Sequence, residues 1–138
     1  MSVDLSKLQK AVGLTLANHA PLVAILGNRK GVIQGGTDRV VTPPYIVLGD
    51  DDMVDTSTDC FSAGRVTFPI KVYTAEDGFR QNKQISAAIA GALDDVAFPV
   101  EGHAVTGCYL MRARFFRDPE AGIRQGVNEF QIDIEATA

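Results

Sequence analysis

The chain has 138 residues and a net charge of −4, with 46% hydrophobic and 22% charged residues. This length fits one domain, which can bury about two-thirds of the surface of its unfolded chain. The acidic balance argues against a protein that binds nucleic acid through a basic surface. The longest apolar run, 21–26, is too short for a membrane span of roughly 20 residues. The N-terminus lacks a basic region followed by an apolar stretch, so we expect a cytoplasmic chain without a secretory signal.

Two helices are predicted at the start of the chain. Apolar residues recur at spacings of three and four, as in an amphipathic helix with one buried face, at Leu5, Leu8, Val12 and Leu16. Pro21 ends this helix, because proline disfavours the helical conformation in the residue before it. Pro21 also suits the first turn of a second, short helix over 22–26, which Gly27 can terminate.

The next segments predict loops and two strands. Residues 28–43 show no period, and a connection of this length is often a binding or mobile loop. An apolar β run follows at 45–48, and an alternating strand at 65–74. Residues 49–64 are interpreted as a long hairpin connection with a solvated, mobile tip. Pro69 lacks an N–H, which predicts a sheet edge or a bulge at this point.

A third helix and a hairpin complete the chain. The helix is predicted to begin at Gly78, with Asp77 as its cap and a buried stripe at Ile85, Ile89, Ala92, Leu93 and Val96. Alternation over 105–116 and 129–135, around a turn at 118–122, predicts two antiparallel strands. The order of elements predicts an α+β fold with a mostly antiparallel four-stranded sheet and three helices packed on one face, as a single domain over 1–138.

No constellation of catalytic or ligand-binding residues emerges. The aspartates between Asp50 and Asp59 do not follow the spacing of a calcium loop, because three of them are consecutive and point in different directions. The two histidines fit no metal or catalytic motif. Cys60 and Cys108 are far apart in the sequence, and free thiols are expected for both. We therefore expect a protein without catalytic residues, metal or cofactor.

Charge is segregated on the outward faces of the last two strands. One alternative is pairing across strands within one sheet, where each pair contributes at most about 1 kcal/mol. The other is that a basic edge and an acidic surface attract neighbouring copies head to tail, which closes into a ring. The hypothesis of assembly places a subunit, tube or head interface at Asp50, Asp51, Asp52, Asp55, Arg112, Arg114 and Arg117. It places a lumen or interface surface at Glu129, Asp133 and Glu135.

Segments in nearly the full chain carry a family resemblance. They comprise 21–27 after the first helix, 44–49, 70–73 before the third helix, 85–93, Gly102-His103, and Arg117-Asp118-Pro119 leading into 124–127. In this order and spacing, the chain resembles the tail terminator or tail completion proteins of long-tailed phages, prophages and gene transfer agents. Tyr73 stands where members of the family often have tryptophan.

The resemblance implies a tail-terminator-like domain and a virion protein without catalytic residues. It would form a homohexameric ring at the head-proximal end of the tail, end polymerisation of the tail tube and join tail to head. Its partners would be itself, the tail tube protein and the head-completion or connector protein, with DNA only in transit and no membrane. The alternatives are another ring component, such as a tail tube or head-completion protein, and a host α+β domain that binds a small ligand.

Overall fold

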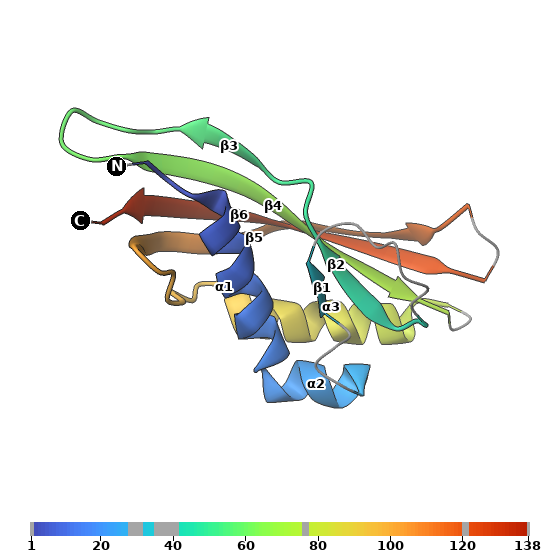
Figure 1. The fold of residues 1–138 in the computed structure, drawn as a ribbon. Helices are drawn as coiled ribbons and strands as arrows, with labels where there is room; N and C mark the ends of the chain where they lie inside the picture. Colours follow the sequence, from blue (N-terminus) through green and yellow to red (C-terminus); the bar gives the residue numbers. More distant parts are fainter. Residues whose placement is uncertain (1, 28–31, 35–41, 76–77, 120–121, 138) are drawn as a thin grey trace.

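The computed structural model describes residues 2–27, 32–34, 42–75, 78–119 and 122–137. Its elements are α1 (Leu5–Ala17), α2 (Ala20–Leu26), β1 (Val32–Gln34), β2 (Tyr45–Leu48), β3 (Asp52–Asp55), β4 (Ala63–Thr74), α3 (Arg80–Leu93), β5 (His103–Arg117) and β6 (Arg124–Ala136). The strands form one sheet in the order β1-β2-β4-β6-β5, and β3 pairs with β4. The helices lie on one face of this sheet (Figure 1). The predicted α+β class is confirmed, with six strands in place of the expected four.

The core lies between the helices and the covered face of the sheet. Alternate residues of β6 are buried, from Asn128 through Phe130 and Ile132 to Ile134, which confirms the alternation read from the sequence. The helices meet them with buried apolar side chains at Leu8, Val12, Leu16, Leu22, Ile85, Ile89 and Leu93. Burial of such side chains is the main stabilising contribution to a domain of this size.

The boundaries of the two N-terminal helices, α1 and α2, follow local sequence signals. The carboxylate of Asp4 accepts a hydrogen bond from the Ser6 N–H at 3.0 Å and so caps α1. Pro21 lies in the first turn of α2, and Gly27 ends that helix with a φ of 83°. The N-cap of α3 is Phe79, and the predicted cap Asp77 lies outside the described residues. Val96 was expected in the buried stripe, but it lies beyond the end of α3 and is 36% exposed.

Two short strands occur where the sequence predicted connections. β1 lies within 28–43 and pairs in parallel with β2, while β3 lies within 49–64 and pairs antiparallel with β4. Three or four residues are too few for periodicity to distinguish a strand from a loop. β1 forms because β2 offers it hydrogen-bonding partners, and β3 forms because β4 does. Such pairing depends on the tertiary structure.

Pro69 lies in an interior strand, not at an edge of the sheet. On one side β4 pairs with β6 through Pro69, and on the other its partner changes from β2, ending at Ile70, to β3, beginning at Thr67. The two residues between them, Phe68 and Pro69, have no register partner on that side. The proline, which cannot donate to a ladder, is thus accommodated where one strand replaces another.

The register of β5 shifts twice, between Val105 and Gly107 and between Leu110 and Arg112. Each extra residue of such a bulge reverses which face the following side chains occupy. The expected alternation placed Tyr109 with Val105 on one face, whereas the structure buries Val105 and Cys108 and exposes Tyr109. The periodicity of this strand was therefore misread in its middle part.

A buried polar cluster ties α3 to the sheet. The amide nitrogen of Asn82 donates to the carbonyl oxygens of Val72 and Arg124 and to the hydroxyl of Thr74, each at 3.2 Å. The amide of Asn128 likewise donates to the hydroxyl of Ser86 on α3 at 3.1 Å. Burial of an amide N–H without a partner costs free energy, so these contacts favour one position of α3 along the strands.

Candidate assembly surfaces

The face of the sheet opposite the helices carries both signs of charge. Register and alternation place four acidic and four basic described side chains on it: Asp52, Glu129, Asp133 and Glu135 with Arg65, Lys71, Arg112 and Arg114. The predicted lumen or interface residues of β6 therefore share one face, as the alternation indicated. They lie in a face of balanced charge and do not form a purely acidic one.

Among the described residues, one of the three β6 acids, Asp133, forms an ion pair. The Arg65 side chain donates to the carboxylate of Asp133 at 3.0 Å, and both side chains are partly exposed. An exposed pair of this kind contributes at most about 1 kcal/mol. Arg112 lies opposite Glu129 in the register of β5 and β6, but the ion pairs between described residues are Arg65–Asp133 and Lys71–Asp50. Pairing across strands thus accounts for Asp133 alone among the three acids.

The three predicted arginines lie in the second half of β5, which is an edge strand of the sheet. Arg112, Arg114 and Arg117 are all exposed, and the Arg114 guanidinium lies 5.6 Å from the centre of the Phe116 ring. The first half of this edge is covered, because the Leu110 N–H donates to the Asp94 carboxylate and the Asp95 N–H to the Cys108 carbonyl. Within the described ranges, the part of this edge without such a contact is therefore the basic part.

The four predicted aspartates lie in and next to β3, which β4 and β6 separate from β5. Lys71 donates to the Asp50 carboxylate at 2.7 Å, and this hydrogen bond lowers the pKa of Asp50 and raises the pKa of Lys71. Hydrogen bonds from Ser57 lower the pKa of Asp55. Asp52 and Asp55 are exposed on opposite faces of β3, and Asp51 is half-buried. β4 and β6 separate this acidic group from the arginines of β5, so the two sets do not meet within one molecule.

β3 and its turn form a projecting arm, which we define as residues 52–62. Every residue from 52 to 61 is exposed, including the large apolar side chains of Met53, Val54 and Phe61. The turn is nonetheless ordered by hydrogen bonds, from the Thr58 N–H to the Phe61 carbonyl at 3.0 Å and from the Thr56 N–H to the Ala63 carbonyl at 3.0 Å. Figure 1 shows this hairpin extending beyond the helices, near both chain termini. The sequence predicted a solvated tip here and missed its apolar side chains.

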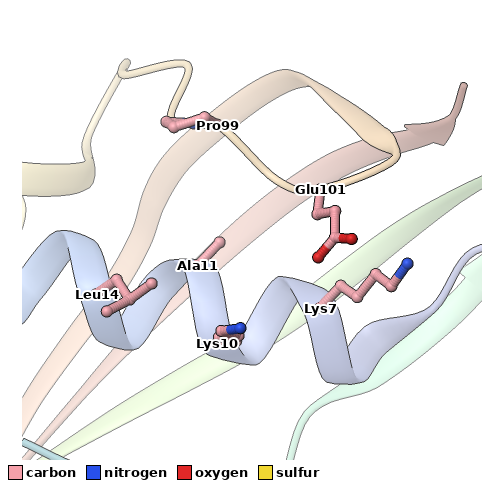
Figure 2. Close-up of a pocket in the computed structure, with 6 residues that line it drawn as sticks. All are labelled: Lys7, Lys10, Ala11, Leu14, Pro99 and Glu101. Atoms are coloured by element: carbon pink, nitrogen blue, oxygen red, sulfur yellow. The ribbon is translucent and has the colours of Figure 1, made fainter.

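A hollow lies between α1 and the segment that leads into β5 (Figure 2). We call it the α1 hollow; its volume is about 210 Å³ and it is lined by Lys7, Lys10, Ala11, Leu14, Pro99 and Glu101. In Figure 2, Leu14 and Pro99 lie at one end, and Lys7 and Glu101 face each other at the other. Leu14 is 51% exposed and lies off the buried stripe of α1. The sequence signal for this hollow was the spacing of Leu14, which follows Lys10 by four residues and Lys7 by seven and so shares their side of the helix.

His103 and the two cysteines also have side chains of types used in catalysis or metal binding. His103 accepts a hydrogen bond from the Asp4 N–H through Nε2 at 3.0 Å, and its Nδ1 lies 2.7 Å from the Glu101 carbonyl oxygen. Both cysteines are free thiols, and burial raises the pKa of Cys108 to about 12. Within the described residues, no three His, Cys, Asp or Glu side chains come together in a way that could hold a metal ion. α3, with 14 residues, and the other described helices are too short to cross a membrane.

The structure is an open sheet with helices on one face and charged, exposed surfaces toward its edges, and a fold alone does not define a function. A family model described as tail completion protein gp17 matches residues 10–135. The chain belongs to this family, which confirms the resemblance seen in the sequence and makes it a structural protein of a phage-type virion tail.

Comparison with solved structures agrees with this assignment. A chain in a structure described as the virion of a native gene transfer agent particle is similar, with 27% identity and a TM-score of 0.85. The similarity covers 94% of this chain and 95% of that chain. No curated protein sequence matches this one.

Proposed function

We propose that the protein is a tail terminator: a single domain over 1–138 that forms a homohexameric ring at the head-proximal end of the tail, ends tube polymerisation and joins the tail to the head. The family and the similar chain in a gene transfer agent virion support a role in a tail. The number of subunits follows from the family resemblance. The protein acts through its surfaces and catalyses no reaction. Its partners are its own copies, the tail tube protein and the head-completion or connector protein.

The observation that carries this proposal is the separation of charge across one sheet. The acidic group at Asp50, Asp51, Asp52 and Asp55 and the basic group at Arg112, Arg114 and Arg117 lie on opposite sides of β4 and β6. Two unlike surfaces that attract each other give a head-to-tail contact, and such a contact closes into a ring when its rotation divides the circle. Charge of this kind guides the approach and the specificity of the partners more than it adds affinity.

DNA passes through the ring in this proposal, without a membrane partner. Glu129, Asp133 and Glu135 remain candidates for the lumen or for an interface. The pair between Arg65 and Asp133 favours an interface role for Asp133, because its charge is already compensated. Glu129 and Glu135 are better placed to repel the phosphate backbone of passing DNA.

Removal of the gene from the particle that encodes it tests the function. A terminator predicts tails of uncontrolled length that stay separate from filled heads, and purified protein should cap one end of these tails in negative-stain images. If the protein were instead the tail tube protein, removal of its gene would leave no tubes at all. A head-completion protein predicts tails of normal length beside heads that lose DNA. Either of the last two outcomes would contradict the proposal and support the alternative ring component.

Reversal of the basic edge tests the ring contact. The variant Arg112→Glu with Arg114→Glu should cap tails at least tenfold less efficiently at equal concentration. A matched control is Gln84→Glu with Ala87→Glu, which adds negative charge at two exposed positions of α3, outside the strand that carries the arginines. Equal capping by all three proteins would remove the arginines from the interface.

A further inference from the structure

The arm presents an apolar and acidic surface that the molecule itself does not cover. Phe61 is 44% exposed and Val54 is 65% exposed, and Asp59, two residues before Phe61, is exposed as well. Exposed apolar side chains grouped on a projecting element mark interaction sites in soluble proteins. The hydrogen bonds of the turn hold this surface in one shape, which lowers the conformational cost of docking. The arm is therefore prepared to contact another molecule.

The α1 hollow has the complementary character. Leu14 and Pro99 give it an apolar end, and both are exposed. Lys7 and Lys10 contribute two positive charges against the one negative charge of Glu101, and Lys10 forms no ion pair with any residue in the described ranges. Its volume of about 210 Å³ is far above the roughly 10–15 Å³ that one water needs, so a side chain of a neighbouring molecule can enter it.

The two surfaces lie at the same end of the strands. The Thr56 N–H bonds to the Ala63 carbonyl at the start of β4, and Ala63 is in register with Glu135, which is in register with Ala104 near the start of β5. Pro99 and Glu101 of the hollow directly precede β5. The arm belongs to β3 on one side of the sheet, and β5 forms the edge on the other side. A neighbour placed beside the sheet could therefore receive the arm at this level.

We propose that the arm of one subunit docks in the α1 hollow of the next subunit in the ring. Phe61 packs against Leu14 and Pro99, and Asp59 lies beside Lys7 and Lys10. The arm thereby provides a second head-to-tail contact beyond the charged edge, and this inference rests on the proposed ring. Because the two docked surfaces are different, each subunit gives one arm and receives one, which suits a closed ring.

Cross-linking of assembled protein tests the contact directly, because Cys60 lies beside Phe61 at the tip of the arm and is exposed. The variant Leu14→Cys places a thiol in the hollow, while the buried thiol of Cys108 stays protected. On tails capped by this variant, a short bis-maleimide reagent should join subunits into a ladder of covalent oligomers. The ladder should disappear when Cys60→Ser is added, and Gln84→Cys on the exposed face of α3 should give no ladder.

A charge exchange provides a second, independent readout. Asp59→Lys and Lys10→Asp should each lower capping at least fivefold, and the double variant should recover most of it. Ring-capped tails that give neither the ladder nor the recovery would overturn the docking contact and leave the terminator function intact. A cross-link from Cys60 to the tail tube protein would also overturn it, in favour of an arm that grips the tube. Tails that are never capped would refute both proposals.

Discussion

Two hairpins of this protein project from the same sheet and are stabilised in different ways. The hairpin of β5 and β6 is held by α3 and its N-cap residue Phe79. Lys83 lies 5.4 Å from the centre of the Phe115 ring, and Arg124 lies 5.8 Å from the centre of the Phe79 ring. The Asn82 amide donates a hydrogen bond to the Arg124 carbonyl. The arm of β3 and β4 is held by its strand pairing and by the hydrogen bonds of its turn. The comparison teaches that one hairpin presents its arginines from a strand held by α3, while the arm presents its side chains without such support.

The largest expected contrast is between two phenylalanines. Phe130 of β6 is 1% exposed in the core, whereas Phe61 of the arm is 44% exposed. Phe130→Ala should lower the free energy of unfolding by about 3–5 kcal/mol, because it leaves a cavity, and Phe61→Ala should change it by less than about 0.5 kcal/mol. Urea denaturation followed by circular dichroism measures both. A large loss of stability in Phe61→Ala would mean that the arm belongs to the core.

The attachment of α3 to the sheet is tested at Asn82. Asn82→Ala removes three hydrogen bonds from a buried site and should lower the free energy of unfolding by about 2–3 kcal/mol. The control Gln84→Ala, at an exposed position of the same helix, should be nearly neutral. Gly126→Ala should also destabilise the protein, because the added Cβ would collide with the Asn82 side chain. Equal stability of Asn82→Ala and the control would show that α3 is positioned by apolar packing alone.

The ion pair between Lys71 and Asp50 gives a smaller effect that depends on pH. The pKa of Asp50 is lowered from 3.8, so the stabilisation from this carboxylate is present above pH 3.8 and is lost as the pH falls through the lowered value. The pKa of Lys71 is raised from 10.5, so its contribution is present below pH 10.5 and is lost as the pH rises further. Lys71→Met should thus be slightly less stable than the parent at pH 7 and equal to it near pH 2. Unfolding curves at both pH values measure this difference, and a gap that persists at pH 2 would assign it to packing.

The two thiols provide a probe that leaves stability unchanged. Cys60 at the arm is exposed, while burial raises the pKa of Cys108 to about 12 and leaves little reactive thiolate near neutral pH. Titration with a disulfide reagent at pH 8 should modify one thiol per folded chain and two in denaturant. Rapid modification of both in the folded protein would show that β5 opens locally, which would weaken the contrast between the hairpins.

Much of the fold was predictable because its signals are local. The stripe of α1, the proline and glycine around α2 and the alternation of β6 each depend on neighbouring residues, and the structure confirms them. The family was likewise predictable from segments in sequence order. The residues assigned to the interface stay a prediction, although the structure places Asp52 on β3 and Arg112 on β5, with β4 and β6 between them.

The sequence by itself determined the class of fold, the helices and the longest strands, because hydrophobic periodicity acts over a few residues. Only the tertiary structure decided that 52–55 is a strand, that Pro69 lies inside the sheet and that a register shift after Val105 turns Cys108 inward and Tyr109 outward. It alone brought Leu14 and Pro99 to the lining of one hollow and set Phe61 in an exposed arm. These features depend on hydrogen bonds and contacts between segments far apart in the chain, and no local pattern encodes such partners.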